Sequence, residues 1–184
     1  MPAQKSHAAI IGGGVMGGDI AIIFASGGWN VHVMSPSRKT RDALPARLAT
    51  GLKKLRAPES NAANVKTYAR LDDLPWKDIS IVVEAATEDL PLKHRLFAEL
   101  ERLARPDALL TSNTSTFPIG DIGKALNTHA RVAGLHFFMP AHLVPLVEVI
   151  SAVFTDAKVA EQLMKLMRQL GKAPVTSPAA SSGW

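Results

Sequence analysis

The sequence predicts an α/β fold in which a doubly wound, mostly parallel sheet carries helices on both faces. Two observations predict it. Short apolar runs alternate along the chain with segments of helical periodicity, without an internal repeat or a block of charge. The first apolar run also ends in a cluster of glycines, which is typical of a strand that turns tightly into a helix. Together they indicate a sheet of the Rossmann type.

The first unit of this pattern comprises residues 8–34. Residues 8–11 (Ala-Ala-Ile-Ile) are a short apolar strand, and apolar residues then recur at helical spacing from Val15 to Phe24. Gly27 and Gly28 end this helix, and residues 30–34 alternate in the manner of a second strand. The sequence therefore opens with one βαβ unit.

The same alternation continues to residue 170. The pattern predicts strands at residues 65–68, 79–84, 108–112, 132–136 and 146–150, and helices at residues 39–57, 91–103, 119–126 and 156–170. Residues 57–64 are expected to form a loop. Thr155 is the expected N-cap of the last helix and Gly171 its end.

Size and composition favour one domain. The chain has 184 residues, of which 47% are hydrophobic, and it has no cysteine to form disulfides or thiolate metal sites. We predict a dinucleotide-binding domain at residues 1–175 and a linker-like tail at 176–184, with no further core-forming element after Lys172. The N-terminus has neither a signal peptide nor a membrane-spanning run, so we expect a cytoplasmic protein without a membrane partner. The net charge of +5 is scattered, which argues against nucleic acid as a partner and suits small anions.

The glycine cluster predicts a phosphate cradle. Residues 12–17 (Gly-Gly-Gly-Val-Met-Gly) match the pattern Gly-x-Gly-x-x-Gly between a strand and a helix. Gly12 permits the tight turn, Gly14 lets the backbone approach a pyrophosphate, and Gly17 allows the helix to pack closely on the strand. With Val15 and Met16 they would hold the anion at the helix N-terminus. A glycine turn that serves packing alone is the alternative.

The end of the second strand bears on the choice between NAD and NADP. A carboxylate that binds the ribose 2′-hydroxyl is expected about 20 residues after the glycines. Ser35 occupies this place and Arg38 follows it, so a 2′-phosphate would be attracted. The same residues also suit an ordinary polar turn before a basic helix. We therefore expect NAD as the cofactor and keep NADP open.

Five motifs, in this order and spacing, resemble the NAD-binding domain of the 3-hydroxyacyl-CoA dehydrogenases over residues 7–175. They are residues 12–17, residues 84–88 (Glu-Ala-Ala-Thr-Glu) with Lys93, residues 112–115 (Ser-Asn-Thr-Ser), residues 136–140 (His-Phe-Phe-Met-Pro) and residues 145–149 (Pro-Leu-Val-Glu-Val). The resemblance implies a reaction that oxidises an L-3-hydroxyacyl thioester, an acyl-CoA, to the 3-ketoacyl thioester.

His136 and Glu148 are the predicted catalytic residues. His136 lies near the carboxyl end of a strand, where open α/β sheets bind their ligands, and an imidazole can take the hydroxyl proton. Glu148 is a carboxylate in an apolar run, so it is the natural partner of the imidazole. A histidine at the end of a strand is otherwise often only a packed core residue.

The resemblance also assigns roles to three further residues. Ser115 would bind the substrate oxygen and line the nicotinamide pocket, or else cap the helix near residue 119. Glu88 and Lys93 would contact the cofactor, or else form a solvated pair of charges at the start of a helix. The remaining histidines lack such a setting, and we expect no metal.

The sequence departs from the family's pattern in three places. Met139 stands where the family has an asparagine, and the segment between Ser35 and Thr67 is shorter than the family's helical hairpin. After Lys172-Ala173-Pro174-Val175 the family continues into a helical domain that this sequence lacks. Two functions therefore stay open: a dehydrogenase, or a non-catalytic or truncated dinucleotide-binding module like the family's crystallin members. A homo-oligomer also stays open.

Overall fold

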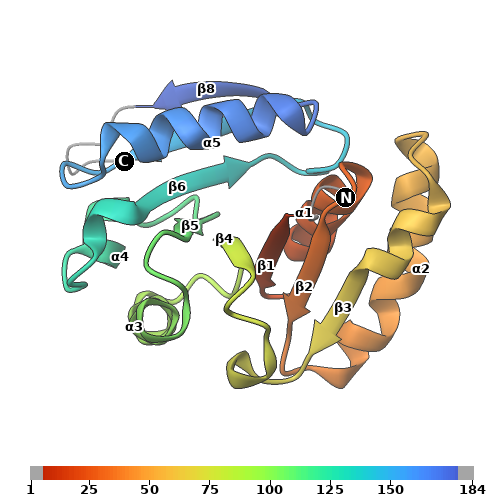
Figure 1. Ribbon diagram of the computed structural model, residues 1–184, viewed down its shortest axis with the longest axis horizontal. Helices are drawn as coiled ribbons and strands as arrows, with labels where there is room; N and C mark the ends of the chain where they lie inside the picture. The colour runs from red at the N-terminus through yellow and green to blue at the C-terminus, as the bar shows by residue number, and fades with distance from the viewer. Residues whose placement is uncertain (1–5, 178–184) are drawn as a thin grey trace.

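The computed structural model describes residues 6–177, which form one eight-stranded sheet with helices on both faces (Figure 1). The strand order is β3-β2-β1-β4-β5-β6-β7-β8, so the predicted fold class is confirmed. The strands are β1 (His7–Ile11), β2 (Asn30–Met34), β3 (Val65–Tyr68), β4 (Ile79–Glu84), β5 (Leu109–Ser112), β6 (Val132–Phe137), β7 (Leu146–Ser151) and β8 (Ala173–Ser177).

Five α-helices in the described part of the chain divide between the two faces. Helices α1, α2 and α5 share one buried cluster with the sheet, and α3 and α4 share the other. Short 3₁₀ helices join some of the elements. The α-helices are α1 (Val15–Ser26), α2 (Arg38–Lys54), α3 (Leu90–Leu103), α4 (Ile119–Gly123) and α5 (Ala157–Gln169), and the 3₁₀ helices are Glu59–Asn64, Leu71–Asp73 and His129–Arg131.

The topology places a ligand crevice at the centre of the sheet. From β1 the chain crosses to β2 and β3 on one side and then returns to β4 on the other side of β1. Open α/β sheets bind ligands at such a switch point, outside the carboxyl ends of the strands. Residues that follow β1, β4, β5 and β6 are therefore the ones expected to meet there.

Strand β7 reverses the direction of the sheet. It pairs antiparallel to β6, and β8 then pairs parallel to β7. In this register His136 on β6 lies directly opposite Glu148 on β7. The reversal thus brings together two residues that are twelve positions apart in the sequence.

Three local expectations were wrong. Residues 59–64 of the expected loop form a 3₁₀ helix, and the N-cap of α5 is Asp156, whose side chain accepts a hydrogen bond from the Lys158 amide. Thr155 instead donates its hydroxyl to the Val132 carbonyl. The segment after Lys172 forms β8, although no residue of this strand is buried. The predicted domain boundary at residue 175 stays a prediction, since residues 178–184 lie outside the described part.

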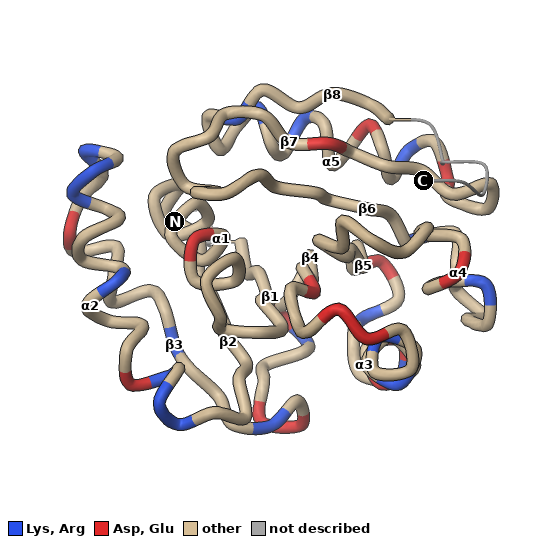
Figure 2. The backbone as a smooth tube through the Cα atoms, turned by 180° about the vertical axis from the view of Figure 1, so that it is seen from behind, with Lys and Arg blue, Asp and Glu red and all other residues tan. Residues whose placement is uncertain are grey.

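Charged side chains lie on the outer helices. Figure 2 shows Lys and Arg along α2, which borders the side of the sheet formed by β2 and β3. Within residues 6–177, no helix is both long and apolar enough to cross a membrane.

A hydrogen-bonded chain of rings connects the first three strands. His32 on β2 contacts His7 Nδ1 through Nε2 and the Tyr68 hydroxyl through Nδ1, each at 3.0 Å. His32 is buried, and this burial, with the positive charges of His7 and Lys66, lowers its pKa from 6.5 to about 4, although Asp78 opposes the shift. His32 is therefore neutral in the folded protein at physiological pH.

This shift predicts that acid destabilises the fold between pH 6.5 and pH 4. The pKa of His32 is lower when the protein is folded, so the unfolded chain binds more protons in this range and the free energy of unfolding falls as pH drops. We expect His32 to account for about 3 kcal/mol of this loss, which is complete below pH 4. Urea unfolding at half-unit pH steps measures it.

The matched variants for this prediction are His32→Gln and His94→Gln. His94 is exposed on α3, where its Nε2 lies 2.9 Å from the Asp121 carbonyl, and its replacement is the surface-histidine control. His32→Gln should flatten the curve between pH 6.5 and pH 4. An equally steep curve in His32→Gln would show that another group is responsible.

Candidate active site

The glycine turn after β1 has the geometry that its sequence pattern predicts. Gly12 has φ +107°, which L side chains rarely adopt, and its amide donates to the Met34 carbonyl at 2.9 Å. A Cβ on Gly17 would lie 1.7 Å from the Gly12 carbonyl oxygen, so α1 packs too closely on the turn for any side chain there. Gly14 differs, because a Cβ there would meet nothing within 4 Å.

The N-terminus of α1 suits an anion. Gly14 is its N-cap without a side-chain hydrogen bond, and the first turn contains no acidic residue. The first intrahelical bond runs from the Gly18 amide to the Gly14 carbonyl, so the amides of Val15, Met16 and Gly17 precede the helical ladder. These amides and the helix dipole match the charge of a pyrophosphate, and the open space at Gly14 lets it approach. The residues present therefore fit a dinucleotide.

The two glycines predict opposite defects. Gly14→Ala should fold like the wild type and weaken NADH binding by about tenfold or more, because its methyl group enters the space that the pyrophosphate needs. Gly17→Ala should unfold at a lower temperature, because its methyl group meets the Gly12 carbonyl. Thermal melting and NADH fluorescence titration measure the two effects. Equal loss of stability in both variants would contradict this division.

Ser35 lies beside this turn at the end of β2, and Arg38 is the first residue of α2. A Cβ on Gly13 would lie 3.3 Å from Ser35 Cβ, so Ser35 contacts the glycine turn, where it is buried. The Arg38 guanidinium is exposed and forms an ion pair of 3.4 Å with Asp42 one helical turn later. Both residues thus lie near the first turn of α2, and neither supplies a carboxylate.

His136 and Glu148 form a direct pair. His136 Nδ1 lies 2.9 Å from Glu148 Oε2, across the antiparallel strands β6 and β7. A carboxylate only accepts hydrogen bonds, so Nδ1 carries a proton, and in the neutral imidazole Nε2 keeps its lone pair. The His136 side chain is 17% exposed and that of Glu148 is 32% exposed. The imidazole is thus fixed in one tautomer and still reachable from outside.

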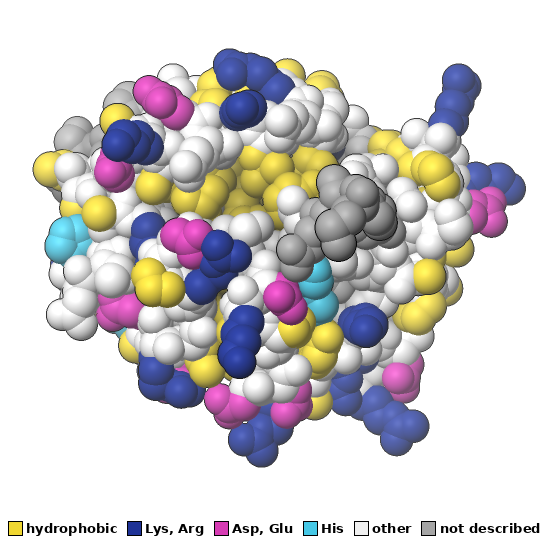
Figure 3. Space-filling model, viewed as in Figure 1, with side chains coloured by type: hydrophobic (Ala, Val, Ile, Leu, Met, Phe, Trp, Pro, Cys, Tyr) yellow, Lys and Arg dark blue, Asp and Glu magenta, His cyan; other side chains and the backbone are white. Residues whose placement is uncertain are grey.

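A pocket of about 330 Å³ surrounds His136. It brings together residues that follow four strands, as the topology requires: Met16 after β1, Glu88 after β4, Ser115 after β5, and the end of β6 with Met139. The other lining residues are Ala85, Ala86, Lys93, Asn113, Phe137 and Phe138. On the face shown in Figure 3, hydrophobic side chains gather in a hollow along β6. Of the predicted site residues, Met16, Glu88, Lys93, Ser115 and His136 line this one pocket.

The loop that carries Ser115 is held by Glu88. The Ser115 amide donates to Glu88 Oε1 at 3.1 Å, and the Thr114 hydroxyl donates to Glu88 Oε2 at 2.9 Å. Ser115 does not cap α4, whose N-cap is Pro118 without a side-chain bond. The neighbouring Thr114 hydroxyl instead accepts bonds from the amides of residues 116 and 117. The Ser115 side chain is thus placed at the pocket without a capping role.

Lys93 is buried, so it is not part of a solvated pair of charges. Its side chain is 1% exposed and donates to both carboxylate oxygens of Glu84 at 2.9 Å. Its ammonium also lies 3.3 Å from Glu88 Oε2. Lys93 therefore links the end of β4 to the loop that carries Ser115.

Two residues without a predicted role complete this framework. Glu84 is fully buried and accepts further bonds from the Ser112 hydroxyl at 2.6 Å and the Ala86 amide at 2.7 Å. Asn113 lines the pocket, and its side-chain oxygen accepts the Phe137 amide beside His136. A carboxylate that ends an apolar strand was the available signal for Glu84.

Comparison with known proteins identifies the family of this domain. The family model "3-hydroxyacyl-CoA dehydrogenase, NAD binding domain" matches residues 7–180. A 3-hydroxyadipyl-CoA dehydrogenase of Escherichia coli K12 is 40% identical, over 91% of this chain and 36% of that protein. A glyoxysomal fatty acid beta-oxidation multifunctional protein of Brassica napus is 32% identical, over 95% of this chain and 25% of that protein.

Solved structures give the same result. A 3-hydroxybutyryl-CoA dehydrogenase of Escherichia coli K12 superposes with a TM-score of 0.86 at 35% identity, over 96% of this chain and 39% of the other. An (S)-3-hydroxybutyryl-CoA dehydrogenase of Ralstonia eutropha superposes with a TM-score of 0.87 at 30% identity, over 96% and 65%. The chain spans about a quarter to a third of the curated relatives named above. It belongs to the 3-hydroxyacyl-CoA dehydrogenase family, of which it represents the NAD-binding domain.

Proposed function

We propose that this protein transfers hydride between an L-3-hydroxyacyl-CoA and NAD, with His136 as the general acid and base. The observation that carries the proposal is the hydrogen bond of 2.9 Å between His136 Nδ1 and Glu148. His136 also lines the central pocket. Met16, in the first turn of α1 after the glycines, lines the same pocket and supports a cofactor end of the site there. The acid/base group His136 and the cofactor end of the site thus lie in the same pocket.

The hydrogen bond to Glu148 gives neutral His136 the tautomer that the oxidation direction needs. With Nδ1–H donated to Glu148, Nε2 accepts the proton of the 3-hydroxyl group while its carbon loses hydride. The imidazolium that forms faces the Glu148 carboxylate, which stabilises the positive charge. In the reverse direction the same nitrogen returns the proton to the ketone oxygen.

The remaining residues position the reactants. NAD, when bound, accepts the hydride at its nicotinamide ring. The α1 N-terminus holds the pyrophosphate, and Ser115 donates its hydroxyl to the substrate oxygen beside His136. Glu88 contacts the cofactor from the β4 side, and the buried Lys93 holds Glu88 and with it the Ser115 loop in place. The apolar lining from residues 137–139 limits water near the reacting atoms.

An acyl-CoA is the substrate class that we favour. Relatives at 30–40% identity carry the names 3-hydroxybutyryl-CoA and 3-hydroxyadipyl-CoA dehydrogenase. The net charge of +5 suits the phosphates of coenzyme A as well as those of the dinucleotide. Cytoplasmic location and a homo-oligomer stay predictions, and one relative named above is glyoxysomal.

The direct test mixes the protein with NADH or NADPH and then with acetoacetyl-CoA, while absorbance of the reduced nicotinamide is recorded. We expect NADH to bind and its band to decay, with much slower decay when free acetoacetate replaces the thioester. Faster decay with NADPH would assign the 2′-phosphate to Arg38 and Ser35. Binding of either cofactor without decay would contradict the proposed reaction and favour a module that only binds dinucleotides.

A further inference from the structure

Asp19 connects the glycine turn to the loop that follows His136. Asp19 is buried in the second turn of α1, at 5% exposure, and each of its two carboxylate oxygens faces a different part of the fold. Oδ1 accepts from Arg47 on α2 at 3.2 Å, and Oδ2 accepts from the Ala141 amide at 3.0 Å. A buried carboxylate needs such partners, because its charge is otherwise left without solvation.

The Arg47 side of this connection is the glycine turn. The same guanidinium donates through Nη1 to the Gly14 carbonyl at 2.9 Å and through Nη2 to the Val15 carbonyl at 2.8 Å. It also lies against Gly18, where a Cβ would come within 2.5 Å of its Nη1. Arg47 therefore fixes the peptide groups whose amides are expected to bind the pyrophosphate, and it does so while bonded to Asp19.

The Ala141 side is the loop between the two catalytic strands. Residues 138–145 join β6, which carries His136, to β7, which carries Glu148. The first two residues of this loop, Phe138 and Met139, line the pocket around His136. Ala141, which follows shortly after them, is fully buried where Asp19 holds it.

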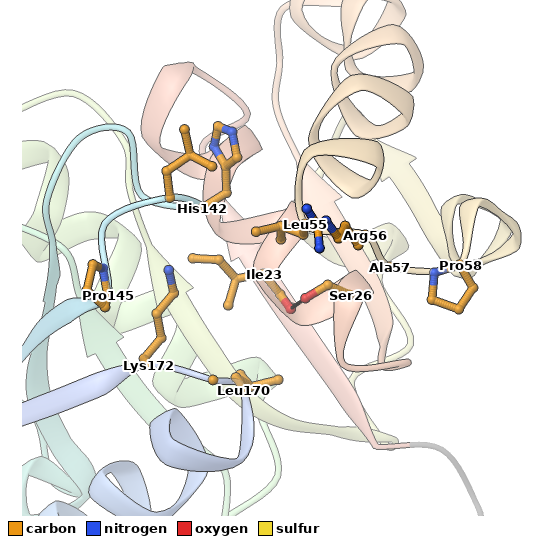
Figure 4. Close-up of a pocket in the computed structure, with 12 residues that line it drawn as sticks. Ile23, Ser26, Leu55, Arg56, Ala57, Pro58, His142, Pro145, Leu170 and Lys172 are labelled. Atoms are coloured by element: carbon orange, nitrogen blue, oxygen red, sulfur yellow. Dashed lines mark hydrogen bonds between the residues drawn. The ribbon is translucent and has the colours of Figure 1, made fainter.

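Lys172 holds the same loop from the opposite side. Its ammonium donates to the Ala141 carbonyl at 2.6 Å and to the Val144 carbonyl at 2.9 Å. Burial lowers its pKa to about 8, and the Asp19 charge opposes the shift, as expected for neighbouring groups. Figure 4 shows the Lys172 amine pointing from the start of β8 into a second pocket that His142 and Pro145 also line. His142 Nδ1 lies 3.1 Å from Asp19 Oδ2.

We propose that Asp19 is a positioning residue that couples occupation of the dinucleotide cradle, through Arg47, to the loop after His136. When dinucleotide phosphates bind the amides after Gly14, they favour one arrangement of Arg47, Asp19 and Ala141. This arrangement in turn fixes the position of Phe138 and Met139 beside His136. The inference rests on the proposed role of His136, but the coupling itself is measured by ligand binding and needs no catalytic turnover.

ADP-ribose separates this coupling from direct contact. It carries the pyrophosphate and lacks the nicotinamide, so it occupies the glycine turn without a ring beside His136. In the wild type we expect the Ala141 amide resonance to shift when ADP-ribose binds, since its proton is donated to Asp19. Amide NMR spectra recorded during the titration give both this shift and the dissociation constant.

Arg47→Met is the main variant, because Arg47 is one-third exposed and Asp19 keeps the Ala141 amide and His142 beside it; thermal melting checks that the variant is folded. We expect ADP-ribose affinity to fall about 3- to 30-fold and the Ala141 shift to lose at least half its size, as the loss of a coupling contact predicts. Asp19→Asn keeps an oxygen for the Ala141 amide and loses the charge that faces Arg47. The double variant Asp19→Asn/Arg47→Met should therefore bind ADP-ribose no more weakly than the more severe single variant. Arg102→Met, which removes an exposed ion pair on α3, is the control.

Three results would overturn the coupling: no Ala141 shift in the wild type, an unchanged shift in Arg47→Met despite weaker binding, or additive effects of the two variants. In the second case Arg47 would support the glycine turn alone. A wild type that shows the coupling but does not oxidise NADH with acetoacetyl-CoA would refute the proposed reaction and leave this inference standing.

Discussion

His136→Gln is expected to lower kcat by about 10²- to 10⁴-fold, the usual contribution of a general acid or base. Glutamine keeps a side-chain amide near Glu148 but cannot take a proton from the 3-hydroxyl group. The glycine turn and α1 N-terminus are untouched, so the dissociation constant of NADH should stay close to that of the wild type. Steady-state kinetics with acetoacetyl-CoA and a fluorescence titration with NADH measure the two quantities.

Two further variants give the His136 prediction its controls. Glu148→Gln keeps a hydrogen-bond acceptor for Nδ1 and removes the charge that stabilises the imidazolium, so it should lower kcat less than His136→Gln does. His94→Gln, on the exposed face of α3, should behave like the wild type. If NADH affinity fell in parallel with kcat in His136→Gln, His136 would be a residue that shapes the pocket and not the acid/base group.

Lys93→Met is expected to have the largest effect on stability, with a loss of about 3–5 kcal/mol in the free energy of unfolding. The replacement leaves Glu84, which is fully buried, without its cationic partner. The remaining bonds from Ser112 and the Ala86 amide are not sufficient to balance a buried charge. Urea unfolding without cofactor at pH 7 measures the loss.

The double variant Glu84→Gln/Lys93→Met separates the charge from the packing. With both charges removed, much of the lost stability should return, since the cost arises from one unpaired ion. Arg102→Met removes an exposed pair and should leave the urea midpoint close to that of the wild type. A double variant as unstable as Lys93→Met would show that lost packing, and not the unpaired carboxylate, causes the effect.

Most of the fold could be predicted from local sequence patterns. Periodicity places the strands β1, β2, β4, β5 and β6, because each is a short run of mostly apolar residues, whereas β3 (Val-Lys-Thr-Tyr) has no buried residue. The glycine pattern likewise carries its geometry within six residues, as Gly12 and Gly17 demonstrate. The pair of His136 and Glu148 was predicted from chemistry and resemblance, and the structure places the two side chains in contact.

The parts that could not be predicted depend on tertiary contacts. The antiparallel direction of β7 arises from an eight-residue loop, and nothing in the apolar run of β7 encodes it. The partners of Asp19 come from residues 28 and 122 positions away. Strand β8 is exposed and starts with Ala-Pro, so it lacks the buried apolar pattern that reveals a strand in sequence. Such features become visible only when distant segments are placed together.

Single-turnover mixing tests the central claim most directly, that His136 and a bound nicotinamide work in one pocket. Protein saturated with NADH would be mixed rapidly with acetoacetyl-CoA, for the wild type and for His136→Gln, and the nicotinamide absorbance followed. The proposed mechanism predicts one equivalent of NADH oxidised per site in the wild type, and a first-order rate at least about 10²-fold lower in the variant. Equal rates in the two proteins, or no oxidation in a wild type that binds both reactants, would contradict it.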